Sequence, residues 1–110
     1  MRRRIFLFFI LVLFYSGAAL ADPFVGHFQG EIEGVTHELI LYSDSAGVYD
    51  GELRATDVRL PVFGNRYGDY MIGKIGFPED QFEFRGRILG AILVIERRDG
   101  SRLKFFRKKN

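Results

Sequence analysis

The sequence predicts an all-β domain, folded as a small up-and-down antiparallel β-barrel of about eight short strands. A glycine–aromatic–glycine–aliphatic unit recurs along the chain, and its leading glycines stand at 26, 47, 68 and 86. A nearly constant step of about twenty residues is typical of a repeated supersecondary unit. Within each unit apolar and polar residues alternate with a period of two, which indicates strands. No stretch after residue 21 has helical periodicity, so helices are not expected.

The first 21 residues are expected to be a signal peptide. Arg2–Arg4 form a positive n-region, Ile5–Phe14 is an unbroken apolar run, and Ala19-Leu20-Ala21 has the small-x-small form of a cleavage site. An uncleaved membrane anchor is the alternative, although the apolar run is shorter than the roughly 20 residues that a spanning helix needs. We therefore predict an exported protein, periplasmic or secreted, with a single β-barrel domain over residues 22–110.

Four strands are expected in the first half of this domain, at residues 25–33, 36–42, 48–54 and 58–63. Phe28, Gly30 and Ile32 share one face of the first, and Leu39 and Leu41 share one face of the second. Turn residues separate the strands at Gly34-Val35, at residues 43–47 and at residues 55–57. If Gly34-Val35 is a two-residue turn, His27 lies opposite Tyr42.

Four more strands are expected at residues 69–75, 81–85, 88–96 and 101–107. Turns are predicted at residues 64–68 and 77–80, and Asp99-Gly100 is a strong hairpin signal. The segment from Ile88 to Glu96 is the most apolar, which favours a strand that is covered on both faces.

A meander of eight strands leaves two unpaired edges, and closure into a barrel removes them. A two-sheet sandwich is the alternative. Gly51 and Gly90 are expected where a strongly coiled strand has no room for a side chain. Closure places Phe28 on the first strand close to Phe105 on the last, with both rings buried.

The barrel interior is the candidate ligand site. At this strand number the interior is just filled by side chains or holds one small ligand. The inward-facing residues proposed to line it are Phe28, His37, Tyr49, Tyr70, Phe82, Phe84 and Phe105. An empty apolar cavity of at least about 300 Å³ would favour binding of a small apolar molecule. A packed interior would favour the alternative, a structural or inhibitory module that interacts through its surface.

Gly26-His27-Phe28 on the first strand and Arg107 at the end of the last resemble the lipocalin-like (calycin) barrels. Those barrels carry Gly-x-Trp on the first strand, with an arginine of the last strand across the ring; Phe28 stands here in place of the tryptophan. The repeated Tyr-x-Gly-x-Leu units also resemble small exported bacterial barrels. The resemblance implies a barrel fold and, by analogy, binding of an apolar molecule.

The sequence offers little for catalysis or for metal binding. It has no cysteine and two histidines, and the strand alternation places His27 and His37 on opposite faces. The serines of the domain lie at turns, without the glycine-flanked context of a hydrolase nucleophile. Its carboxylates fall on solvent faces or turns, not in a cleft where a base needs to be held. We therefore expect a non-enzymatic binding module, for a small apolar ligand or an envelope partner, with no metal and no cofactor.

Charge divides sharply along the domain. Residues 22–84 hold 4 basic and 12 acidic side chains, whereas residues 85–110 hold 9 basic and 2 acidic ones. Such asymmetry can mark a segment that binds an anionic surface. Arg97, Arg98, Lys108 and Lys109 are the candidate contacts with an anionic membrane or an acidic partner. Nucleic acid is not expected as a partner of an exported protein.

Internal pairing is the alternative explanation of the charge division. If the first and last strands pair, Glu31 and Glu33 lie beside Arg102 and Lys104, and opposite charges across strands stabilise a sheet by about 0.2–1 kcal/mol each. Lys108 and Lys109 lie beyond the last strand with no acidic partner in this arrangement, so they are expected to be free.

N-terminal processing gives a first test. Cleavage after Ala21 should give an exported protein whose N-terminal sequence begins Asp-Pro-Phe, because Ala19 and Ala21 satisfy the small-residue requirement of the cleavage site. Edman sequencing or intact-mass measurement of the exported protein checks this. Recovery of the chain with Met1 intact in the membrane fraction would contradict it.

Overall fold

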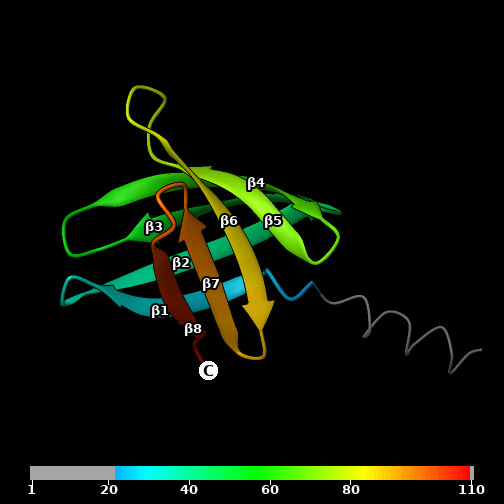
Figure 1. Cartoon of the computed structure of the whole chain (residues 1–110), viewed down its shortest axis with the longest axis horizontal. Helices are drawn as coiled ribbons and strands as arrows, with labels where there is room; N and C mark the ends of the chain where they lie inside the picture. Colours follow the sequence, from blue (N-terminus) through cyan, green and yellow to red (C-terminus); the bar gives the residue numbers. More distant parts are fainter. Residues whose placement is uncertain (1–21, 110) are drawn as a thin grey trace, which may run out of the picture.

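In the computed structural model, which describes residues 22–109, the chain forms a closed barrel of eight antiparallel strands in sequence order (Figure 1). The expected signal peptide, residues 1–21, and Asn110 lie outside the described residues. No helix occurs between residues 22 and 109. Pairing of the first strand with the last closes the barrel, which confirms the predicted up-and-down topology and excludes the two-sheet sandwich.

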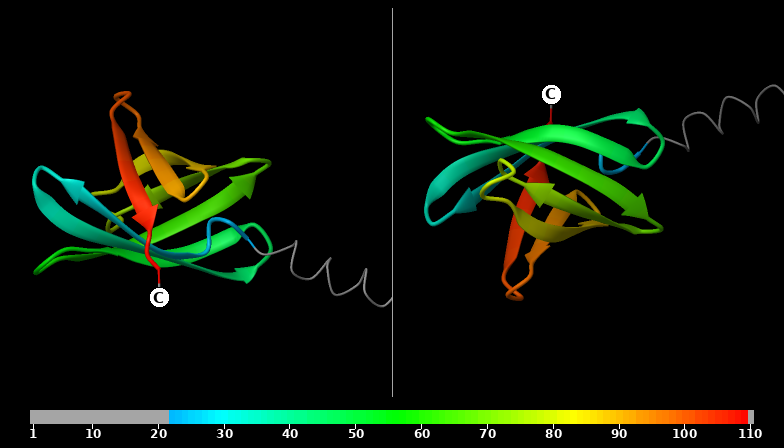
Figure 2. Two further views of the ribbon diagram at one scale, coloured as in Figure 1. Left: turned by 90° about the horizontal axis from the view of Figure 1, so that it is seen from below. Right: turned by 90° about the horizontal axis from the view of Figure 1, so that it is seen from above.

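Every strand pairs with the strands before and after it in the chain, so neighbours in sequence are neighbours around the barrel (Figure 2). The strands are β1 (Gly26–Ile32), β2 (Val35–Ser45), β3 (Val48–Arg54), β4 (Arg59–Tyr67), β5 (Tyr70–Ile75), β6 (Phe82–Leu89), β7 (Ile92–Arg97) and β8 (Arg102–Arg107).

The first hairpin turns one residue earlier than expected. Ile32 pairs with Val35, so Glu33 and Gly34 form the turn, and both have positive φ angles, of 52° and 80°. Two positive φ angles define the type I′ turn, whose twist matches that of the flanking strands. The register therefore moves by two residues, and His27 faces Ile40 instead of Tyr42. A shift of two preserves the face of every side chain, so the inward and outward assignments of both strands hold.

The predicted strand over residues 88–96 is wrong, because a hairpin turn divides it. β6 continues through Gly86 to Leu89, the chain turns at Gly90-Ala91, and β7 begins at Ile92. Gly90 has a φ of 64° and open space around it. It therefore belongs to the turn, contrary to the expectation that it lies in a coiled strand. The sequence concealed this turn because apolar residues flank Gly90-Ala91 on both sides.

Two other turns are shorter than predicted. β4 extends to Tyr67, which leaves Gly68-Asp69 as the turn, and β2 extends to Ser45 with a register shift after Tyr42. Polar residues at the ends of these strands look like turn residues in the sequence. They pair with the neighbouring strand nonetheless: Ser45 with Val48, Asn65 with Ile72 and Arg66 with Met71.

The interior of the barrel is packed by large side chains that lie over glycines of neighbouring strands. A Cβ atom added at Gly73 would come within 2.6 Å of the Phe84 ring, and one at Gly86 would lie 3.0 Å from Met71. At Gly30 it would lie 3.1 Å from the Phe105 ring. Small residues opposite large ones let a narrow barrel fill its own interior. Gly51 is needed for another reason: an added Cβ would collide with the backbone carbonyl of Ile40 on the neighbouring strand.

The seam between β1 and β8 closes the barrel. Phe28 pairs with Arg107 and Gln29 with Phe106, and the backbone N–H of Lys108 donates to the carbonyl oxygen of His27 at 2.9 Å. Phe28 and Phe105 are both buried in the same core cluster, as closure predicts. β8 therefore lies between β7 and β1 (Figure 1).

Phe105 and its neighbour Phe106 offer a matched pair of substitutions. Phe105 is 2% exposed and Phe106 is 52% exposed. Truncation of a buried Phe to Ala costs roughly 3–5 kcal/mol, so Phe105→Ala should lose most of the folding free energy of so small a domain. Phe106→Ala should stay within about 0.5 kcal/mol of wild type, as surface substitutions usually do. Urea unfolding checks both. Equal midpoints for the two variants would refute the closure of the barrel through β8.

Candidate functional site

Four of the residues expected to line the interior lie there. Phe28, Tyr49, Phe84 and Phe105 are buried in one core cluster, and they come from β1, β3, β6 and β8. They belong to one cluster with the apolar side chains between them, so the rings form the core itself. The structure thus brings these four together, as the strand alternation predicts.

The other three lie elsewhere. His37 and Phe82 occupy inward register positions near the rim, opposite Gly30 and Ile75, and both remain partly exposed. Tyr70 is on the outer face, so its assignment to the interior is wrong. Gly68-Asp69 makes a two-residue turn in which Tyr70 pairs with Tyr67. The inward position therefore passes to Met71, which is fully buried.

The packed rings leave the interior without a ligand-sized space around them. Five of the surface hollows over residues 22–109 are not lined by Phe28, Tyr49 or Phe105. Phe84 borders one of them, a hollow of about 290 Å³ that also touches Ile72 and Arg85. Those hollows are open and are lined mainly by residues of the barrel rims and outer face.

The segment Asp22–Val25 closes one end of the barrel. The Phe24 side chain enters that end and is 1% exposed, with its ring centroid 5.7 Å from that of Tyr49. The Arg66 guanidinium also lies over the Phe24 ring, 5.4 Å from its centroid. This end is called the closed end below; the sequence pattern, which starts at Val25, did not reveal it.

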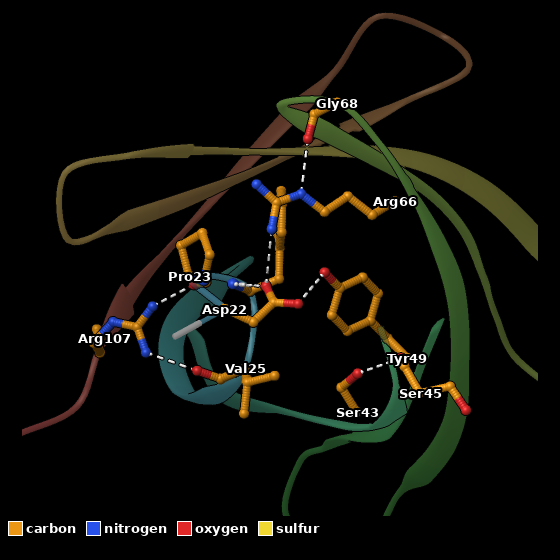
Figure 3. A network of polar contacts seen from close by, with 10 residues as sticks. Asp22, Pro23, Val25, Ser43, Ser45, Tyr49, Arg66, Gly68 and Arg107 are labelled. Carbon is orange, nitrogen blue, oxygen red and sulfur yellow. Dashed lines mark hydrogen bonds and ion pairs between the residues drawn. The ribbon is translucent and has the colours of Figure 1, made fainter. Parts of the chain in front are cut away.

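The Asp22 carboxylate holds this segment in place (Figure 3). One oxygen, Oδ2, accepts a hydrogen bond of 2.5 Å from the Tyr49 hydroxyl. The other, Oδ1, accepts from the backbone N–H of Phe24 at 2.9 Å and lies 3.4 Å from Nη1 of Arg66. Hydrogen bonds to an ionised carboxylate are about twice as strong as neutral ones, so Asp22 ties the start of the domain to β3 and β4.

Arg107 holds the same segment from the side of β8. Its guanidinium lies 4.6 Å from the centroid of the Phe28 ring and donates hydrogen bonds to the carbonyl oxygens of Val25 and Pro23. A cation over an aromatic face is stabilised by the ring quadrupole. The arginine of the last strand thus lies across the aromatic ring of the first strand.

The Tyr49 hydroxyl is held in its neutral form. Burial, which penalises the phenolate, and then the hydrogen bond to the Asp22 carboxylate raise the pKa of Tyr49 from 10.0 to about 12. A carboxylate acceptor favours the protonated phenol, because ionisation would place two negative charges together. Tyr49 is therefore suited to a structural role at neutral pH.

His27 and His37 lie on opposite faces, as predicted. His27 is exposed on the outer face, whereas His37 shares the inner face with Leu39, and its Nδ1 lies 2.9 Å from the carbonyl oxygen of Val35. Among residues 22–109 no three His, Cys, Asp or Glu side chains come close enough to hold a metal ion.

The basic residues expected to share an anionic contact are divided between the two ends of the barrel. Arg97 and Arg98 lie at the β7–β8 turn, and Arg97 donates to the Ser101 hydroxyl at 2.8 Å. Lys108 and Lys109 follow the other end of β8, six residues away. A strand of that length spans roughly 20 Å, so the four do not form one patch.

Lys108 also has an acidic partner inside the fold, contrary to expectation. Its Nζ lies 2.5 Å from Oε2 of Glu38, and this hydrogen bond, followed by the positive charge, lowers the pKa of the Glu38 carboxyl. Lys108 continues along β1, where its backbone N–H donates to His27, and its side chain reaches Glu38 on β2, which the sequence could not show. Lys109 is exposed.

The predicted ion pairs of Glu31 and Glu33 with Arg102 and Lys104 are not among those that residues 22–109 form. Arg102 contacts Glu96 on β7 at 3.2 Å instead. Glu33 lies in the turn beyond the end of β1, and the β1–β8 ladder contains two residue pairs. The strands diverge before Glu31 and Glu33 reach the basic residues, and an open hollow lies between them.

Comparison with protein-family models, curated proteins and solved structures found no match to this chain. Within residues 22–109 no helix is long and apolar enough to cross a membrane.

The pKa of Tyr49 gives a test of the closed end. The folded state keeps the Tyr49 proton more tightly than the unfolded state, so its contribution to stability is complete below pH 10 and is lost as pH rises towards 12. Spectrophotometric titration should show a phenolate that forms only near pH 12 and that is missing in Tyr49→Phe. Asp22→Asn should lower this pKa only in part, since burial is the larger cause.

The matched control is Tyr42→Phe, which removes a tyrosine hydroxyl from the exposed outer face. It should leave the late phenolate unchanged. If Tyr49→Phe also leaves the titration curve unchanged near pH 12, the Tyr49 hydroxyl is not held against Asp22.

Proposed function

We propose that this chain is an exported, non-enzymatic β-barrel module that binds a partner through its outer surface. The observation that carries the proposal is the packed interior, where Phe84 lies over Gly73 and Met71 lies over Gly86 with fully buried side chains around them. A ligand pocket of the usual kind has a volume of about 300–1,000 Å³. The rings of Phe28, Tyr49 and Phe105 line none of the hollows described above, so a partner would contact the rims and the outer face.

The closed end adds a second reason. Phe24 and the hydrogen bonds of Asp22 and Arg107 cover one entrance of the barrel. A ligand that entered there would have to displace a buried aromatic ring together with several hydrogen bonds to ionised groups. Such rearrangement makes lumenal binding unfavourable at this end.

A relation to the lipocalin-like barrels is part of this proposal. Its support is the set of Gly26, Phe28 and Arg107, in which the guanidinium of the last strand covers the first-strand ring. The apolar-ligand function of that family does not follow for this chain, because Phe28, Tyr49 and Phe105 occupy the space that a ligand would take. Export is proposed on the leader pattern of residues 1–21.

Native mass spectrometry of protein recovered from exporting cells tests the proposal. The expected mass is that of the bare chain, because the interior is filled by its own side chains. A small apolar molecule retained at one per chain would overturn the surface-binding function and move the site to the lumen.

Leu93→Ala provides the matched control, since Leu93 is 0% exposed and its truncation leaves an apolar cavity. Engineered cavities of this kind bind small apolar molecules such as benzene. Benzene should raise the melting temperature of Leu93→Ala and leave that of wild type unchanged. Equal stabilisation of both would reveal a natural cavity and contradict the proposal.

A further inference from the structure

The outer face of β6, β7 and β8 combines two kinds of side chain in an ordered way. The register aligns Leu89, Ile92 and Phe106 in one row across the three strands. Leu89 is 58% exposed and Phe106 52% exposed. The row lies beside the Gly90-Ala91 turn at the closed end. There the carbonyl oxygen of Ala91 accepts a hydrogen bond from the backbone N–H of Arg107. This apolar row therefore forms an exposed edge of the barrel.

Basic side chains follow directly behind the apolar row. Arg87 and Lys104 are exposed on either side of Val94 in the next row. Two residues along a strand span roughly 7 Å. The charges thus stand at a fixed, short distance from the apolar edge.

A third row completes the arrangement with Arg85, Glu96 and Arg102. Glu96 is the one carboxylate in the three rows, and Arg102 pairs with it at 3.2 Å. The Arg85 guanidinium lies 4.8 Å from the centroid of the Tyr70 ring, which fixes its direction along the surface. A shallow hollow of about 150 Å³ opens among the arginines of β6 and β8. The three rows carry four basic groups against one acid.

We propose that this face, with Leu89 and Phe106 at its edge and Arg85, Arg87 and Lys104 behind, docks on an anionic phospholipid bilayer. The inference rests on the proposed function, because it names the partner of a barrel that acts through its outer surface. Interfacial proteins bury apolar side chains about 5–10 Å into the headgroup region. At that depth the second row would meet the lipid phosphates, which attract Lys and Arg.

The opposite end of the barrel favours the same orientation. Its turns carry Glu33, Asp57, Glu79, Asp80 and Asp99, with Arg98 among them. A negative surface would repel this end and attract the basic face. An acidic protein could pair with the arginines, but it would give no reason for an exposed apolar edge of Leu89 and Phe106 next to them. The combination of both features favours a bilayer.

The start of the domain lies on the same side as the apolar row. Asp22 and Phe24 are bound at the closed end, where β1 begins and β8 ends. The apolar edge therefore lies at the end of the barrel where the domain begins.

Co-sedimentation with vesicles tests the inference. The processed chain that begins at Asp22 is mixed with vesicles of equal parts phosphatidylglycerol and phosphatidylcholine, or of phosphatidylcholine alone. Binding is expected to the anionic vesicles and to weaken with salt. Each basic side chain near such a surface changes affinity about fivefold. The triple variant Arg85→Gln/Arg87→Gln/Lys104→Gln should therefore bind roughly a hundredfold more weakly.

The matched control removes three exposed basic residues elsewhere, Arg59→Gln/Lys74→Gln/Arg98→Gln, so that both triple variants have the same net charge. It should bind nearly as well as wild type. A second pair of double variants tests the apolar edge. Leu89→Ser/Phe106→Ser should lose the binding that persists at high salt. Val58→Ser/Phe77→Ser, at the opposite end of the barrel, should keep it. Thermal melting confirms that each variant is folded.

Three results would overturn the inference: no binding of wild type to anionic vesicles at low salt, equal losses in the two triple variants, or binding to polyglutamate in place of vesicles. The last result would assign the basic face to an acidic protein. None of them bears on the packed interior, so the proposed function would fail separately, through a retained lumenal ligand.

Discussion

Arg107 joins the two ends of the domain, and the closed barrel depends on that junction. The β1–β8 ladder has two residue pairs, whereas every other ladder has at least five. The guanidinium adds contacts where the ladder is short: it covers Phe28 and donates to the carbonyl oxygens of Pro23 and Val25. A single side chain at the end of β8 thereby fixes the segment that precedes β1. Without it, the first and last strands would be joined by the two-pair ladder, the backbone hydrogen bond from Lys108 to His27 and the packing of Phe28 and Phe105 in one core cluster.

The junction also decides where a partner can bind. With Asp22–Val25 fixed, Phe24 fills the closed end and completes a core in which bulky side chains lie over glycines. The proposed contacts with a partner then lie on the outer face, whose chemistry follows from the strand order. β6, β7 and β8 come from the basic end of the sequence, and up-and-down topology places them side by side. The charge division along the chain becomes a division around the barrel.

The strand alternation predicted the main features of the fold for a definite reason. Side chains of a strand point alternately to two faces, so Phe28, Tyr49, Phe84 and Phe105 could be placed inside from their spacing alone. Errors arose at the turns. Tyr70 was misplaced because the turn before it uses two residues, and the strand over 88–96 was too long because Gly90-Ala91 lacks polar neighbours. A register error of one residue reverses the inward and outward faces of a strand, whereas the two-residue shift at the first hairpin does not.

The candidate surfaces were harder to predict than the core. Arg97, Arg98, Lys108 and Lys109 are close in sequence, yet a strand separates them into two pairs at opposite ends. Arg85 and Arg87 join Arg102 and Lys104 only because β7 brings β6 next to β8. In the sequence Arg85 and Arg87 alternate with Phe84 and Gly86, which predicts that both arginines face outward. Which strands lie beside them depended on the Gly90-Ala91 turn, which brings β7 back along β6.

The sequence by itself determined the class of fold, the number of strands and the burial of the aromatic core, because each depends on local periodicity and on the length of the chain. Three features were decided by the tertiary structure alone: Phe24 fills the closed end, Lys108 pairs with Glu38, and basic groups gather on one face. These features join residues far apart in the sequence, and the closure of the strands into a barrel sets the distances between them.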